Sequence, residues 1–346
     1  MSAVAKNIAL ALQGGGSHGA FTWGVLDRLL EDERLTVDAI SGASAGAMNA
    51  VVLAHGFTAG GREGAREALA KFWTAVSGDS GFRSLFNEFF AAPGRSGIEA
   101  GSRLAPAMEA YLSMARFFTP DQLNPLGLNP LRDLLAKQVD FERLRAECRI
   151  DLFVAATQVS TGRLRLFRTR ELTIDMLLAS ACIPSLHQTV RIDGEGYWDG
   201  GLTANPPLLP LVHQCAARDV VMVLVHLFPG DGLPDTADGI AHRLAEIGFS
   251  TAFFTELNAL AWARQQAVKS WFGFGMLERK LRGLKMHLID EPELMSRLTT
   301  QSKLNTDSAF LLALRDAGRV RADAWLKQNI ESLGKRATFD LAGVLR

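Results

Sequence analysis

Apolar and polar positions alternate along the chain in a way that predicts strands and helices in turn. Residues 7–13 (NIALALQ) form a continuous apolar run, and residues 17–31 follow with apolar side chains at helical spacing. A second short strand is predicted over 36–41, followed by a small-residue helix over 44–54 that ends at Gly56. Because no hairpin turn separates these elements, the order predicts a parallel α/β sheet that is covered on both faces.

The rest of the chain continues this pattern around one loose segment. Further helices are predicted over 60–77, 173–181 and 237–269, and in two segments within 307–332. Further extended segments are predicted over 151–158, 163–168, 188–198, 219–227 and 284–289, the first two as a hairpin. We therefore expect an α/β fold in three α/β/α layers with a mostly parallel sheet. An insertion lies near 78–130, and the C-terminal part is mostly helical.

Composition and charge argue against some classes of function. The 346 residues are 48% apolar and 21% charged, as is ordinary for a globular protein, and 37 basic residues balance 37 acidic ones. This neutral balance gives no support to a dedicated nucleic-acid binder, which usually carries a strongly basic domain. The three cysteines, Cys148, Cys182 and Cys215, have neither a disulfide framework nor zinc spacing, so we interpret them as reduced, buried thiols.

The N-terminal residues and the lengths of the apolar runs indicate where in the cell the protein is expected. The start, MSAVAKNIALALQGGG, has one lysine and a short apolar run that ends in glycines, which predicts a buried strand instead of a signal peptide. No run approaches the roughly 18 apolar residues of a membrane span. We therefore expect a cytoplasmic protein with peripheral, reversible membrane contact.

The first candidate site is the glycine loop that follows the first strand. Glycines at such a turn leave backbone N–H groups free at a helix N-terminus, where negative charge is favoured. Gly14, Gly16 and Gly19 match the dinucleotide fingerprint, and Asp38 follows at a fitting distance. The same loop could instead supply an oxyanion hole for acyl transfer, or be only a tight turn.

The second and third candidates are a serine and an aspartate. Ser44 lies in Gly42-Ala43-Ser44-Ala45-Gly46, which is G-x-S-x-G between a strand and a helix, the context of a nucleophile elbow. Its simpler interpretation is an N-cap serine. Asp199 stands between an extended segment and Gly200-Gly201, where an aspartate usually forms a turn. A serine hydroxyl needs an adjacent base, which Asp199 could be.

Together, Gly14–Gly19, Gly42–Gly46 and Asp199–Gly201 resemble the motifs of the patatin-like phospholipase family, in the same order. The resemblance covers residues 7–212, which it identifies as a catalytic core, with 213–346 as a helical extension packed on the same domain. It implies a patatin-like three-layer sheet. The order of the motifs also argues against a dinucleotide-binding unit, which has no reason to follow its second strand with a nucleophile elbow.

The resemblance implies hydrolysis of a lipid ester, of phospholipase A or lysophospholipase type, by a Ser–Asp dyad. Ser44 would be the nucleophile and Asp199 the base, and no cofactor or metal is implied. The oxyanion hole would be formed by backbone amides of Gly14, Gly15, Gly16 and Ser17. The remaining motif glycines, Gly19, Gly42, Gly46, Gly200 and Gly201, would support these turns. His18 stands where the family often has Arg or Lys, and it is a candidate ligand contact.

Several alternatives stay open at this point. The same dyad would serve a general carboxylesterase, a thioesterase or a polyester depolymerase. A Ser–His–Asp triad is a further alternative, because four histidines follow Asp199 in the chain: His213, His226, His242 and His287. A non-catalytic lipid-binding module or a dinucleotide-binding protein would belong to another class. The sequence does not indicate the oligomeric state.

Two segments are candidates for contact with a membrane surface. Residues 82–90 (FRSLFNEFF) are rich in phenylalanine, and 262–285 combine aromatic residues with six basic residues against one acidic residue. Aromatic side chains beside a basic cluster suit an anionic lipid interface. The alternative is that the aromatic residues belong to the core and the charges to a solvated face.

Overall fold

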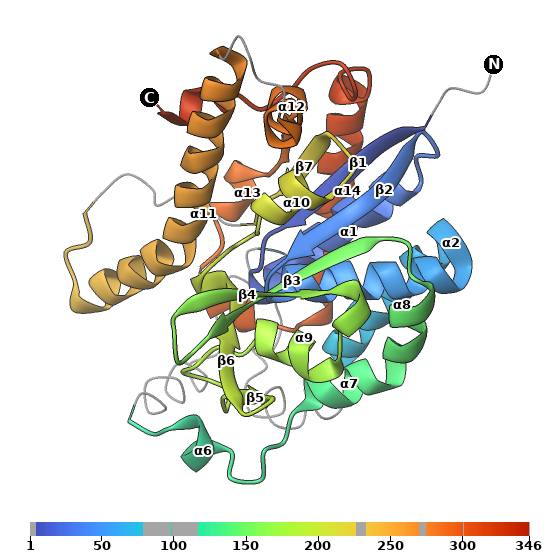
Figure 1. Ribbon diagram of the computed structural model, residues 1–346. Coiled ribbons are helices and arrows are strands. Elements are labelled where there is room, and N and C mark those ends of the chain that lie inside the picture. Colours follow the sequence, from blue (N-terminus) through green and yellow to red (C-terminus); the bar gives the residue numbers. More distant parts are fainter. Residues whose placement is uncertain are drawn as a thin grey trace.

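The computed structural model describes residues 5–78, 98, 117–225, 233–269, 275–299 and 301–345, without the side chains of Asp238 and His242. Its centre is an eight-stranded sheet (Figure 1). The parallel strands are β1 (Lys6–Leu12), β2 (Leu35–Gly42), β3 (Asp151–Gln158), β7 (Asp219–Val223) and β8 (Lys285–Ile289). The antiparallel strands are β4 (Arg163–Arg168), β5 (Val190–Ile192) and β6 (Glu195–Asp199). The sheet order is β5-β6-β3-β2-β1-β7-β8, with β4 also paired to β3.

Helices cover both faces of this sheet (Figure 1). One face is covered by α1 (Gly19–Leu30), α2 (Ala45–Gly78), α7 (Pro130–Gln138), α8 (Phe141–Glu147), α9 (Ile174–Ser180) and α14 (Ser308–Asn329). The other face is covered by α10 (Leu209–Gln214), α11 (Ala237–Lys269) and α12 (Met276–Gly283). Two short helices, α6 (Pro120–Leu123) and α13 (Pro292–Met295), lie in connecting segments. This arrangement gives the three layers that the sequence predicts.

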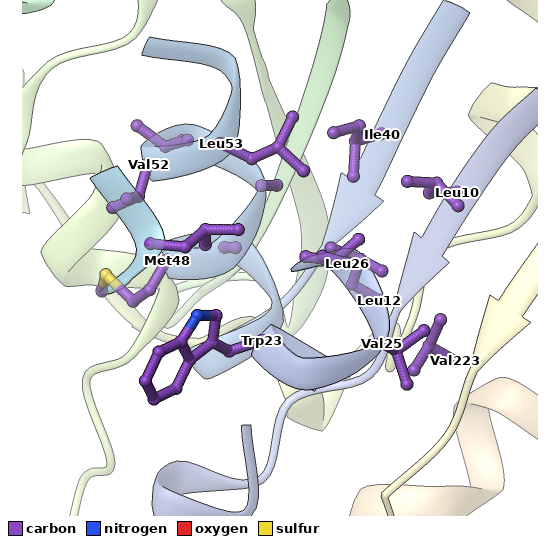
Figure 2. Close-up of a cluster of buried hydrophobic side chains, with 14 of the residues drawn as sticks. Leu10, Leu12, Trp23, Val25, Leu26, Ile40, Met48, Val52, Leu53 and Val223 are labelled. Atoms are coloured by element: carbon purple, nitrogen blue, oxygen red, sulfur yellow. The ribbon is translucent and has the colours of Figure 1, made fainter. Parts of the chain in front are cut away.

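Strand alternation divides the core in two. Successive side chains of a strand point to opposite faces, so Ile8, Leu10 and Leu12 of β1 pack under α1 and α2 while Ala9 and Ala11 face α11. Figure 2 shows the first of these clusters, in which Leu10 and Leu12 lie among side chains of α1, α2 and β7. The continuous apolar run at 7–13 is therefore a strand that is buried on both sides.

Most predicted elements are present, and three of them differ in extent. The helix over 44–54 does not end at Gly56; it continues to a break at Gly60–Gly61, where Gly61 has a φ of 63°. A Cβ on Gly56 would lie 2.4 Å from the Gly64 carbonyl oxygen, so glycine there serves close packing of the two halves of α2. The extended segment over 188–198 consists of two short strands, β5 and β6.

The C-terminal part differs as well. The segment 307–332 holds one helix, α14, instead of two. Residues 213–346 are not only a helical extension, because they supply β7 and β8 to the central sheet, as the separate predictions for 219–227 and 284–289 indicate. Strand β7 pairs directly with β1. The family-like region and the C-terminal part therefore share one sheet.

The pairing of β3 brings the ends of two strands together. Strand β4 pairs along Phe153–Gln158, so it occupies one edge of β3 over this whole length. On the other edge, β2 pairs with the first half of β3 and β6 with the second half, in opposite directions. Gly42 at the end of β2 is paired with Val154, and Asp199 at the end of β6 with Ala156. The carboxyl ends of β2 and β6 therefore face each other across one residue of β3.

Close packing of α14 on α1 gives the first testable prediction. A Cβ on Gly318 would lie 2.1 Å from the Phe21 carbonyl oxygen, so Gly318→Ala must push the two helices apart. We expect a lower Tm, because overpacking costs about 1–3 kcal/mol and exceeds the gain of at most about 1 kcal/mol in helix propensity.

Gly248→Ala on α11 is the matched control, because no heavy atom outside the adjoining residues and backbone of its own helix lies within 4 Å of the added Cβ. This control should raise Tm through helix propensity alone. Thermal unfolding followed by circular dichroism measures both variants. If Gly318→Ala stabilised the protein as Gly248→Ala does, the packing argument would be wrong.

Candidate active site

Ser44 occupies a sharp turn between β2 and α2. Its φ is 52°, a left-handed conformation that is rare for a residue other than glycine and is typical of a nucleophile elbow. The turn is tight because a Cβ on Gly46 would lie 2.1 Å from the Leu12 carbonyl oxygen. The Ser44 N–H lies 3.0 Å from the carbonyl oxygen of Ser180 and 3.1 Å from its hydroxyl, and it donates to both. The strained turn is thus held from α9.

Asp199 lies at the end of β6 and is only 2% exposed. One carboxylate oxygen accepts a hydrogen bond of 2.7 Å from the Gly201 N–H, and the Ser44 side chain lies close enough to lower the pKa of the carboxyl group. The Asp199 N–H donates to the Cys182 carbonyl oxygen at 2.8 Å. A Cβ on Gly200 would lie 2.1 Å from the Ala155 carbonyl oxygen. The structure therefore places Asp199 in the neighbourhood of Ser44.

The environment of Asp199 suits a base. Burial raises the pKa of its carboxyl group to about 6, and the hydrogen bonds from Gly201 and Ser44 oppose part of this increase. A carboxylate with a pKa near 6 is ionised at neutral pH and is a stronger base than an exposed aspartate.

The glycine loop lies directly beside Ser44. A Cβ on Gly14 would be 2.8 Å from the Ser44 Cβ, and Gly16 has a φ of 57°. Within the described parts of the chain, the N–H groups of Gly15, Gly16 and Ser17 have no hydrogen-bond partner. These N–H groups are therefore donors of the glycine loop that no described residue occupies.

Gly14 has a different part in this loop. Its N–H donates to the Asn205 side-chain oxygen at 2.7 Å, so it is already occupied and contributes close packing against Ser44. The sequence places Asn205 beside Asp199 but gives no sign that it would bond to Gly14, because the two residues are far apart in the chain. Gly19 also packs closely, since a Cβ there would lie 2.8 Å from that of Ala45.

His18 lies beneath the loop in a buried position. It is 3% exposed, its Nε2 lies 2.7 Å from the Ser302 hydroxyl oxygen, and its ring meets Phe310 edge-on. Burial, assisted by the charge of Lys303, lowers the pKa of His18 to about 3, so the imidazole is neutral. The structure gives His18 a role in tying the loop to the C-terminal part, and its contact with a ligand stays a prediction.

The histidines of the triad alternative divide into two groups. His287 is buried, and its ring nitrogens pair with Asp219 and Thr338 at 3.0 and 2.9 Å. His213 lies on the exposed side of α10. His226 and the side chain of His242 lie outside the described residues. Of the two histidines after Asp199 that the structure describes with their side chains, one is thus bonded to other partners and the other is exposed, which disfavours a triad.

The remaining candidate groups are Asp38 and the three cysteines. Asp38, the residue that a dinucleotide interpretation would place at a ribose, accepts hydrogen bonds of 2.9 Å from the N–H groups of Ala216 and Ala217. Burial raises the pKa of the Cys182 thiol to about 11 and that of Cys215 to about 12, so both are protonated at neutral pH. Cys148 is only half-buried.

The described residues hold no group of three or more His, Cys, Asp or Glu side chains that could bind a metal ion. None of the described helices is both long and apolar enough to cross a bilayer.

Comparisons with known proteins identify the family. A model of the patatin-like phospholipase family matches residues 10–212, more than half of the chain, and the chain therefore belongs to this family. Membership supports lipid acyl hydrolase activity in general and a lipid substrate. Among solved structures, VipD from Legionella pneumophila is similar at 16% identity and a TM-score of 0.40, over 94% of this chain and 67% of that one. No curated protein matches.

The buried carboxylate gives a prediction about stability. Because the pKa of Asp199 is raised in the folded state, its ionisation destabilises the fold by about 3 kcal/mol once the pH exceeds 6. Below about pH 4 the group is protonated in the folded and the unfolded chain alike, so this effect vanishes. We expect Asp199→Asn to have a higher Tm than wild type at pH 8, with a difference that shrinks towards pH 4.

Thermal unfolding of both proteins between pH 4 and 8 checks this prediction. Asp133→Asn, which changes an exposed aspartate of α7, is the control and should show no such trend. A difference in Tm that stays constant with pH would contradict a raised pKa of Asp199.

Proposed function

We propose that this protein hydrolyses carboxylic esters of lipids, with phospholipase A or lysophospholipase activity, through a dyad of Ser44 and Asp199. The observation that carries this proposal is the left-handed turn of Ser44 between β2 and α2, with the buried Asp199 carboxyl group close to the Ser44 side chain. Family membership supports the lipid substrate in general.

The proposed reaction has two stages. Asp199 accepts the hydroxyl proton as the Ser44 oxygen attacks the ester carbonyl, and the proton then passes to the leaving alcohol as the ester bond breaks. In the second stage Asp199 accepts a proton from water, which attacks the acyl-serine and releases the fatty acid. The proton on Asp199 returns to the Ser44 oxygen.

The glycine loop would stabilise the negative charge of each tetrahedral intermediate. The amides of Gly15, Gly16 and Ser17 have no partner among the described residues, and they open a short 3-10 turn that leads into α1. Donors already fixed in place by the fold need no reorganisation during the reaction, which is what an oxyanion hole requires.

The same dyad could act on other acyl groups. A general carboxylesterase, a thioesterase and a polyester depolymerase would use Ser44 and Asp199 in the same way. The family assignment favours a lipid among these substrates. A cytoplasmic location with peripheral membrane contact is part of this proposal.

The surface for that contact is best argued for 262–285. The side chains of Trp262 and Met276 are 57% and 72% exposed, and a groove of about 390 Å³ lies between α11 and α12. The basic side chains are less available, because Lys280 and Arg282 donate to backbone carbonyl oxygens of the protein. The other candidate, 82–90, lies outside the described residues.

Labelling with a fluorophosphonate tests the dyad. We expect one adduct on wild-type protein, located at Ser44 by peptide mapping and absent from Ser44→Ala. Asp199→Asn should label at least about a hundredfold more slowly, because it removes the base. The rate for wild type should rise with pH through about 6, as Asp199 ionises. Intact mass spectrometry measures each rate.

Cys182→Ala is a control that should label as wild type does. Labelling of Ser44 that ignores Asp199 but requires a histidine would instead support a triad. A folded protein that forms no adduct would contradict a serine hydrolase.

Vesicle binding tests the proposed membrane surface. We expect the double variant Trp262→Ala, Met276→Ser to sediment less with anionic vesicles, because exposed apolar side chains supply the binding free energy at an interface. Hydrolysis of a soluble ester should not change. Val320→Ser, which alters a 72% exposed residue of α14, is the control. Equal binding by all three proteins would remove 262–285 as the membrane surface.

A further inference from the structure

Lys303 is fixed against the glycine loop although it lies near the C-terminus. It belongs to a short 3-10 turn, Gln301–Leu304. A Cβ on Gly16 would lie 2.3 Å from the Lys303 carbonyl oxygen and 3.2 Å from the Lys303 Cβ. Its neighbour Ser302 is bonded to His18 of the same loop. The lysine side chain therefore starts at the loop whose amides face the proposed oxyanion.

The same loop touches the proposed nucleophile two residues earlier. Gly14 packs against the Ser44 side chain, as a Cβ on it would lie 2.8 Å from the Ser44 Cβ. The Cα atoms of Gly14 and Gly16 are at most about 7 Å apart, since two residues of extended chain span no more. Lys303 thus starts within a lipid headgroup's length of Ser44.

Lys303 is also within electrostatic range of an acidic residue on α11. Burial lowers the pKa of its ammonium group to about 8, and Glu246 of α11 acts in the opposite direction. One turn further along α11, Phe249 reaches the Asp199 loop, because a Cβ on Gly201 would lie 2.9 Å from its ring. Residues three apart lie on the same side of a helix. Lys303 therefore lies at the glycine loop, within electrostatic reach of the side of α11 that borders the site.

The ammonium group lacks a close partner in the ranges that the structure describes. No hydrogen bond joins it to a described residue, and no carboxylate of these residues lies within 4 Å of it. His18 does not add a second positive charge beside Lys303, because its imidazole is neutral. A partly buried cation that forms no close ion pair is unfavourable, and an anion entering the site would relieve this.

We propose that Lys303 forms an anion-binding subsite of the active site, and that it takes the phosphate of a lipid whose ester lies at Ser44. This inference rests on the proposed function and narrows its substrate to a phosphate-bearing lipid. The carboxylate of a released fatty acid offers similar charged oxygens, so the experiment must separate the two sources.

Hydrolysis of two esters tests the subsite. The first is monomeric dihexanoylphosphatidylcholine, and the second is p-nitrophenyl butyrate, which has no phosphate. We expect Lys303→Met to lower kcat/KM at least tenfold on the phospholipid and to change it less than twofold on the neutral ester. Lys303→Arg should retain most of the phospholipid activity. Lys335→Met, which removes a lysine that is 70% exposed, is the matched control and should change neither.

Binding to Ser44→Ala separates this inference from the proposed function. Calorimetry on this variant, with and without Lys303→Met, would use dihexanoylphosphatidylcholine, inorganic phosphate and butyrate in turn. Binding of the phospholipid that is lost with Lys303 supports the subsite even if Ser44 proves not to be the nucleophile. Binding of butyrate alone would overturn the phosphate assignment.

Two results would reject the subsite altogether. One is an equal loss of activity on both esters together with a lower Tm, which would identify Lys303 as a structural support for the loop. The other is unchanged hydrolysis and unchanged binding of the phospholipid by Lys303→Met. Retained ester hydrolysis by Ser44→Ala would reject the proposed nucleophile and leave the binding result to decide about Lys303.

Discussion

The structure depends on a constraint at one edge of β3. Two strands share this edge from opposite directions, and their carboxyl ends stop at Val154 and Ala156. Only one residue of β3 lies between these two positions, so the chain must leave the sheet directly after each of the two strands. The serine turn and the Asp199 loop follow these two strand ends, and they lie close together because the strands that carry them end face to face.

Small residues make this meeting possible. Each turn passes so close to a neighbouring backbone that a Cβ would clash, as at Gly46 against Leu12 and Gly200 against Ala155. The glycine loop completes the group by packing Gly14 on Ser44, and Asn205 holds it there by one hydrogen bond. The motif glycines therefore act mainly by lacking a side chain, which allows neighbouring backbone segments to approach closely.

Several features of the site are energetically unfavourable, and the surrounding fold maintains them. Ser44 has a left-handed backbone, Asp199 is buried with a raised pKa, and Lys303 is partly desolvated with a lowered one. Features of this kind persist where the rest of the structure over-determines them, and they are typical of functional sites. The two buried clusters on either face of the sheet supply that support.

The sequence by itself determined the layers, the mostly parallel sheet and the three motifs, because strand and helix periodicity and glycine-rich turns are local properties. It was wrong about the helix end at Gly56, which depends on packing, and it divided 307–332 into two segments where the structure has one helix. Only the tertiary structure decided that Asn205 occupies the Gly14 amide, that His18 is buried and that Lys303 lies at Gly16. These contacts join residues distant in the chain, and their geometry follows from the order of strands in the sheet, which periodicity does not encode.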